Sequence, residues 1–160
     1  MQTQIGTAQF RALAELRYQI RQFVSAGDAA ARDAGLEPQQ YQLPLAIRGL
    51  PETTPATVSM LAERLALKHN SAVELVNRLK ARGMVRRERT GNDRRSVLVR
   101  LRPAGAKLVG RVAQQRIIEL RGDGAALVSA LHAVLTPGVS RLNRKRASKM
   151  PGKKTAGKRR

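Results

Sequence analysis

The sequence predicts a mainly helical (α+β) protein, a winged helix-turn-helix with dimerisation helices at its N- and C-terminal ends. Residues 58–82 carry two short runs with helical spacing of apolar side chains. Residues 84–101 carry two strand-like runs, and the turn-forming residues 90–93 separate them. Apolar residues also recur at helical spacing over 8–34 and through much of 103–135.

The formal net charge of +20 indicates a polyanionic partner. Nucleic acid is the first candidate and an anionic membrane surface the second. Aromatic residues make up only 2% of the chain, which disfavours single strands because these are usually bound by stacking on aromatic rings. Double-stranded DNA is therefore the expected partner. The chain has no Cys, which excludes disulfides, thiolate ligands and cysteine redox chemistry.

The first ten residues lack the basic segment and apolar run of a signal peptide. No apolar stretch approaches the roughly 20 residues that a membrane-spanning helix needs. We expect a soluble cytoplasmic protein that is associated with the nucleoid and has no membrane partner.

The N-terminal part is expected to be a flexible segment, 1–7, followed by two helices in 8–50. The first is one long helix that ends at Gly35. Its apolar stripe is too long for one small core, so part of it should pack on a second subunit. The alternative is an ordinary core helix. Pro44 lies inside the second helix and should kink or shorten it.

Residues 57–102 are expected to form the DNA-binding module. Thr57 is a suitable N-cap for a helix over 58–65. A second, recognition helix should run over 70–82 and end at Gly83, before the hairpin.

The C-terminal part should contain dimerisation helices over 103–136, with a break at Gly122 and Gly124. The last residues, 137–160, contain ten Lys or Arg and no acid, so we expect a disordered basic tail. The tail either adds sequence-blind DNA affinity or only improves solubility.

Six short motifs follow one another in a definite order. They are LEPQQY at 36–41, LAERL at 61–65, AVELVNRL at 72–79, RGMV at 82–85, DRR at 93–95 and LRPAG at 101–105. Their order and spacing resemble the MarR family of transcriptional regulators. Three positions depart from the family pattern: Lys68 stands at a usual Ser or Thr cap, Arg102 replaces a Thr, and Pro44 falls within a helix.

The resemblance implies a homodimer whose first and last helices interlock. It implies recognition helices in successive major grooves and wings that reach the minor groove. It also implies a crevice for a small-molecule effector, such as a phenolic or lipophilic acid, between the dimer helices and the DNA-binding lobe.

The candidate DNA contacts lie first on the recognition helix, whose N-terminal residues meet base edges in this docking mode. They are Lys68, His69, Asn70, Ser71, Ala72, Glu74 and Arg78. Asn70 could read an adenine and Glu74 could accept from a cytosine amine, while Arg78 suits a phosphate. The alternative for Asn70 or Ser71 is that it only caps the helix.

The wing supplies the other candidates, Arg86, Arg94 and Arg95. An inserted arginine suits a narrow minor groove. The resemblance implies that Asp93 and Arg95 form the pair that orders the wing. The alternative is a hairpin tip that only faces solvent.

No catalytic or metal site is expected, and no cofactor. The only histidines, His69 and His132, are far apart, and no nucleophile lies beside a base in a catalytic pattern. We expect a ligand-responsive transcriptional repressor that binds a pseudo-palindromic operator as a homodimer. The alternative function is sequence-blind, architectural DNA binding.

Overall fold

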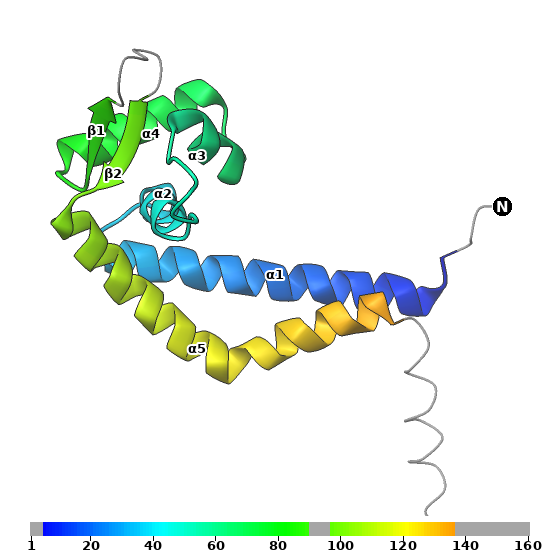
Figure 1. Ribbon diagram of the computed structural model, residues 1–160. Coiled ribbons are helices and arrows are strands. Elements are labelled where there is room, and N and C mark those ends of the chain that lie inside the picture. Colours follow the sequence, from blue (N-terminus) through cyan, green and yellow to red (C-terminus); the bar gives the residue numbers. More distant parts are fainter. Residues whose placement is uncertain (1–4, 90–96, 137–160) are drawn as a thin grey trace, which may run out of the picture. The chain divides into compact units, whose positions relative to one another are not determined.

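The computed structural model describes residues 5–89 and 97–136 (Figure 1). In that part of the chain it contains five helices and a two-stranded sheet, which confirms the predicted mainly helical (α+β) class with a winged helix-turn-helix. The elements are α1 (Thr7–Asp33), α2 (Pro38–Arg48), α3 (Val58–Arg64), α4 (His69–Ala81), β1 (Val85–Arg89), β2 (Val97–Leu101) and α5 (Pro103–Leu135).

The chain divides into two compact units. The larger unit, Gln22–Gly122, contains α2, α3, α4, the sheet and the adjoining parts of α1 and α5. The smaller unit contains α1 up to Arg21 and α5 from Asp123. Every described side chain that we predicted to contact DNA belongs to the larger unit.

The predicted long N-terminal helix is confirmed as α1. Its end is closed by two backbone hydrogen bonds, from the Gly35 N–H to the Arg32 carbonyl at 2.8 Å and from the Leu36 N–H to the Ala31 carbonyl at 2.9 Å. Gly35 has φ +76°, a conformation that glycine adopts without the steric cost of a Cβ. The glycine therefore turns the chain from α1 into α2.

The expectation that Pro44 shortens the second helix is wrong, because α2 continues past it to Arg48. A proline within a helix removes one backbone donor and crowds the preceding turn. Here the Pro44 side chain is among the fully buried ones, so its packing offsets part of that cost.

The helix-turn-helix has the predicted order, α3 then α4. Thr57 is the N-cap of α3, and its hydroxyl accepts a hydrogen bond from the Met60 N–H at 3.2 Å, as predicted. Ala66 makes the turn with φ +51°. The recognition helix α4 begins at His69, one residue before the predicted start, and Gly83 (φ +68°) follows its end.

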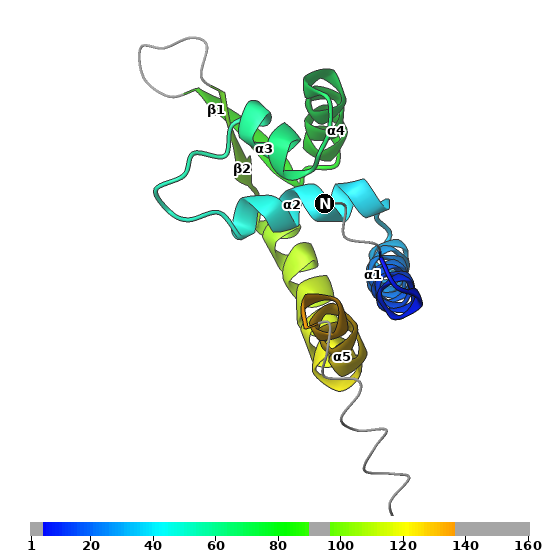
Figure 2. The same cartoon turned by 90° about the vertical axis from the view of Figure 1, so that its right-hand side faces the viewer.

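The strands β1 and β2 pair in an antiparallel ribbon, with Arg86 opposite Arg100 and Glu88 opposite Leu98. The other edge of β2 is partly covered, because the Val99 N–H donates to the Ala56 carbonyl at 2.8 Å. This bond ties the segment before α3 to the sheet. Figures 1 and 2 show the ribbon beside α3 and α4.

The expected break at Gly122 and Gly124 is wrong, since α5 runs through both as one helix. An interior glycine costs about 1 kcal/mol relative to alanine but keeps its backbone hydrogen-bonding groups. The flanking alanines and leucines favour the helix strongly enough for it to continue through both glycines. No helix in the described ranges has the length and apolar character needed to cross a bilayer.

The first turn of α5 lies directly against the corner between α4 and β1. A Cβ added to Gly105 would lie 2.3 Å from the Met84 carbonyl oxygen. The same carbonyl accepts a hydrogen bond from the Arg102 N–H at 2.9 Å. The backbone of α5 can approach this corner only because residue 105 has no side chain.

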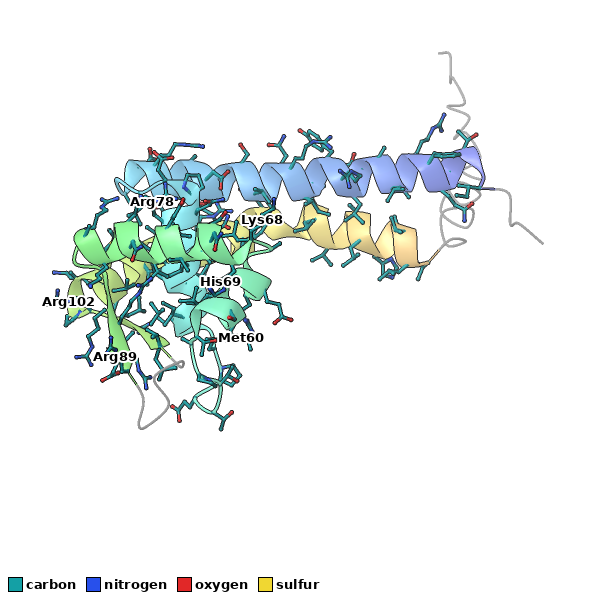
Figure 3. All side chains as sticks on the ribbon, turned by 90° about the horizontal axis from the view of Figure 1, so that it is seen from above. Met60, Lys68, His69, Arg78, Arg89 and Arg102 are labelled. Carbon is teal, nitrogen blue, oxygen red and sulfur yellow. The ribbon has the colours of Figure 1, made fainter. Side chains whose placement is uncertain are left out.

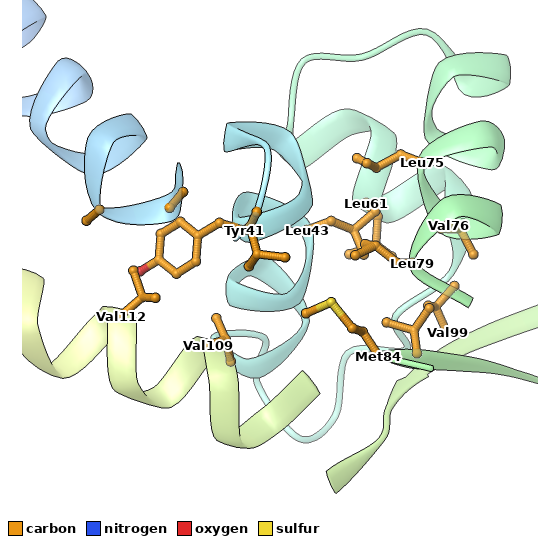
Figure 4. Packing of buried hydrophobic residues seen from close by; sticks show 14 residues of the cluster. Tyr41, Leu43, Leu61, Leu75, Val76, Leu79, Met84, Val99, Val109 and Val112 are labelled. Carbon is orange, nitrogen blue, oxygen red and sulfur yellow. The ribbon is translucent and has the colours of Figure 1, made fainter. Parts of the chain in front are cut away.

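The core of the larger unit joins α2, the helix-turn-helix and the sheet. Figure 4 shows Leu43 of α2, Leu61 of α3, Leu79 of α4, Met84 and Val99 of β2 turned toward one another. All five are buried, and four of them are at most 1% exposed. Through this core the recognition helix packs against α2 and α3.

Candidate nucleic-acid interface

The recognition helix α4 has one buried face and one exposed face. Its buried side chains recur three and four residues apart, at Ala72, Leu75, Val76 and Leu79. This spacing places the remaining side chains on the opposite face. The exposed residues of that face are Asn70, Ser71, Glu74, Asn77, Arg78 and Ala81.

The exposed predicted contacts gather along this face and at the beginning of the helix. Figure 3 shows Lys68 and His69 at one end of α4 and Arg78 farther along it. Lys68 occupies the N-cap position and makes no side-chain capping bond. Asn70 and Ser71 lie inside the first turn of the helix, so neither occupies the capping position that was their alternative role.

Ala72 does not belong to the exposed face, and its prediction as a DNA contact is wrong. It is 0% exposed and belongs to the buried face of α4. Because this side chain is fully buried in the folded protein, it cannot reach a base edge.

Asn77 is an exposed polar residue that the sequence reasoning missed. It follows Asn70 by two helical turns and lies next to Arg78. The buried series that includes Leu75, Val76 and Leu79 points the other way, so helical periodicity alone could have identified Asn77. Its amide can both donate to and accept from a base edge.

The stem of the wing carries an arginine pair bridged by one acid. Arg86 and Arg100 are directly opposite each other in the ribbon. Glu88 lies 3.7 Å from Arg86 Nη2 and 3.2 Å from Arg100 Nε. Their side chains are between 42% and 62% exposed, so each ion pair contributes at most about 1 kcal/mol. The glutamate offsets the repulsion and leaves this stem with a positive charge.

The tip of the wing lies outside the described residues. This applies to the predicted contacts Arg94 and Arg95 and to Asp93, which the resemblance assigned to ordering the wing. It applies also to the basic tail, 137–160.

A second group of polar side chains lies within the larger unit, where α5 meets α1. The Arg116 side chain is only 11% exposed and forms an ion pair with Glu119. Its Nη2 donates to the Phe23 carbonyl at 3.4 Å, and the guanidinium carbon lies 5.8 Å from the centre of the Phe23 ring. Burial raises the pKa of the Tyr41 phenol, and the charge of Arg116 acts in the opposite direction.

In the described ranges, no three His, Cys, Asp or Glu side chains are grouped so that they could hold a metal ion. His69 is at the start of α4 and His132 is in the smaller unit, near the end of α5. The described part of the chain therefore assigns no metal ligands.

The sequence model of the MarR family matches residues 34–96, which contain α2, α3, α4 and β1. This is the segment that carries the exposed face of the recognition helix. No match is found among the curated proteins.

Solved structures of MarR-family proteins share the fold. A MarR family protein from Bacillus stearothermophilus has a TM-score of 0.64 at 20% identity, over 91% of this chain and 98% of that chain. NadR in complex with 4-hydroxyphenylacetate has a TM-score of 0.58 at 19% identity, over 93% and 95%. A variant of MepR from Staphylococcus aureus, bound to an oligodeoxyribonucleotide, has a TM-score of 0.56 at 15% identity, over 83% and 90%.

Proposed function

We propose that this winged helix-turn-helix chain is a protein of the MarR family that represses transcription by binding duplex DNA. In this proposal two copies of the chain bind one pseudo-palindromic operator. Each copy places α4 in a major groove, and a small ligand releases the complex. Repression is steric, because a dimer across two half-sites blocks the DNA that it covers.

The observation that carries the proposal is the exposed polar face of α4. Asn70, Glu74 and Asn77 offer donors and acceptors, and Arg78 on the same face offers positive charge. The opposite face of α4 is buried in the core. The exposed polar face, which we call the reading face, is therefore held in one orientation. The basic stem of the wing, at Arg86, supplies attraction that does not depend on sequence.

The smaller unit supports the proposal of a homodimer. Large apolar side chains of α1 and α5 are exposed there, as in surfaces that another protein covers. They are Phe10, Leu13, Tyr18, Ile20, Val128, Leu131 and Leu135. We assign this surface to a second copy, because two recognition helices at a constant spacing match two half-sites about one turn of DNA apart.

We expect Asn70→Ala and Glu74→Ala each to weaken the preference for one base pair of the operator by about 5–150-fold. A base contact contributes to discrimination, whereas an exposed residue without one does not. The measurement starts with a duplex that the wild-type protein enriches from a random-sequence pool. Binding of each variant is then compared across single base-pair changes in that duplex.

Gln39→Ala is the matched control, since it removes an exposed amide from α2 rather than from α4. We expect it to leave the base preference unchanged. An enriched duplex that outcompetes random DNA by a factor of about 10³ or more supports a regulator. A wild-type protein that binds every duplex alike contradicts the proposal and favours the sequence-blind architectural function.

We propose a small phenolic acid as the effector, on the support of the NadR complex with 4-hydroxyphenylacetate. Arg116 and Tyr41 are the candidate partners for its carboxylate and ring. The carboxylate would have to replace Glu119 as the partner of Arg116. A ligand changes DNA binding only if its affinity differs between the two states of the protein.

We therefore expect 4-hydroxyphenylacetate to weaken binding of the enriched duplex by about 5–150-fold, the range of ordinary allosteric coupling. Fluorescence anisotropy with labelled duplex measures the effect, and benzyl alcohol, which lacks the carboxylate, is the control ligand. Equal DNA affinity with and without the acid would contradict this choice of effector.

A further inference from the structure

Arg82, immediately after the recognition helix, connects three elements that are distant in sequence. Its Nη1 donates to the side-chain oxygen of Gln40 at 2.6 Å, in the first turn of α2. Its Nη2 donates to the carbonyl oxygen of Gly35 at 2.9 Å, just after α1. All three residues belong to the larger unit. The guanidinium therefore joins the end of α4 to the corner between α1 and α2.

The electrostatics of this corner favour a cation. Helices α1 and α4 both end beside Arg82, and the C-terminal end of a helix carries partial negative charge. The acceptor side chain is itself held, because the Gln40 oxygen also accepts from the Glu37 N–H at 3.3 Å. Arg82 thus meets an acceptor that the start of α2 already orients.

The chemistry calls for arginine rather than lysine. A guanidinium is planar and has two terminal nitrogens that can point to two acceptors at once. The ammonium of lysine is a single point with a shorter reach. A lysine at position 82 would keep the charge but could not maintain both bonds in the observed geometry.

A second arginine also contacts α1, within the same unit. Arg116 of α5 donates to the Phe23 carbonyl, while Arg82 donates to the Gly35 carbonyl beyond the end of the helix. The segment from Phe23 to Gly35 is therefore bonded to α5 at its beginning and to the end of the recognition helix at its end.

We propose that Arg82 is a positioning residue that sets the orientation of the recognition helix through Gln40 and Gly35. The inference rests on the proposed function, because it concerns how accurately α4 presents its reading face. Arg82 acts through α4 and does not itself choose a base. A shift of α4 misplaces Asn70 and Glu74 relative to base edges, whereas charge attraction to phosphates tolerates the shift.

We expect Arg82→Lys to weaken binding of the enriched duplex about tenfold and to change binding of a random duplex by less than about twofold. The charge is conserved, so sequence-blind affinity should persist. Gln40→Leu should have a similar selective effect, and Arg82→Lys combined with Gln40→Leu should be no worse than either alone. Gln40→Glu keeps an acceptor and should retain selectivity. Arg48→Lys, at an exposed arginine of α2, is the matched control.

A second measurement does not require DNA. Hydrogen exchange of the amides of Gly35, Leu36, Gly83 and Met84 should accelerate in Arg82→Lys and not in Arg48→Lys. These amides close the ends of α1 and α4. Faster exchange together with selective loss of the enriched duplex supports the proposal.

Two outcomes would overturn it, and a third tests the proposed function separately. Arg82→Lys could bind and exchange like the wild type, which removes any positioning role. It could weaken both duplexes equally, which makes Arg82 a phosphate contact. If the wild type enriches no duplex at all, the proposed function is contradicted. Hydrogen exchange in Arg82→Lys then tests the Arg82 contacts by themselves. Unchanged exchange overturns these contacts, and accelerated exchange supports them.

Discussion

Gly105→Ala should lower the free energy of unfolding by about 2–3 kcal/mol, because its Cβ would occupy the space of the Met84 carbonyl oxygen. The backbone of α5 or of the α4–β1 corner has to move, and the hydrogen bond from the Arg102 N–H to the same carbonyl weakens as it does. For a chain of this size the change corresponds to a melting temperature lower by about 4–12 °C. Urea unfolding at a constant protomer concentration measures it.

Gly110→Ala is the matched control within the same helix. Nothing lies within 4 Å of the added Cβ at this position. The exchange should raise the free energy of unfolding by about 0.5–1 kcal/mol, since alanine is the better helix residue. If both variants were stabilised alike, the close approach between Gly105 and Met84 would be contradicted.

Phe10→Asp should separate the proposed homodimer. Phe10 is 60% exposed on α1, which is far more than an aromatic residue of a closed core would be. Burying a phenylalanine contributes about 1.5–3 kcal/mol, and a symmetric dimer loses this contribution twice. The dissociation constant of the dimer should rise by about 10²–10⁴-fold. Analytical ultracentrifugation over a dilution series measures this change.

Leu45→Asp tests whether the position of the charge matters. Leu45 is 40% exposed on α2, outside the smaller unit. Leu45→Asp should sediment as the wild type does and keep its affinity for the enriched duplex. Phe10→Asp should lose affinity for the same duplex, because the two recognition helices are no longer held together. A Phe10→Asp protein that stays dimeric would show that another surface joins the copies.

The positions of the elements could be predicted where the signal is local. The periodic apolar residues of α1 and α4 predict helices within about a residue of their observed ends. Thr57 predicts the start of α3 because capping depends on the next few residues, and it makes the expected bond to Met60. Most of the exposed polar face of α4 could also be predicted, since Asn70 and Glu74 are exposed as expected.

The predictions from the sequence were wrong where tertiary packing outweighs the local conformational preference of a residue. Pro44 and Gly122 both disfavour a helix in isolation, yet α2 and α5 continue through them. Ala72 lies within the segment expected to contact DNA but is buried, because it falls on the same face of α4 as Leu75, Val76 and Leu79. Asn77 has the exposed position instead, although a stricter use of the helical period would have found it.

By itself, the sequence determined the order of the elements, the basic character and most of the polar residues exposed on α4, because periodicity, turn chemistry and charge act over a few neighbours. Only the tertiary structure decided which residues meet across long separations. Gly105 against Met84, and Arg82 with Gln40 and Gly35, are pairs that no local pattern predicts. Their distances depend on how the helices and the sheet pack together, and that packing is a property of the whole unit.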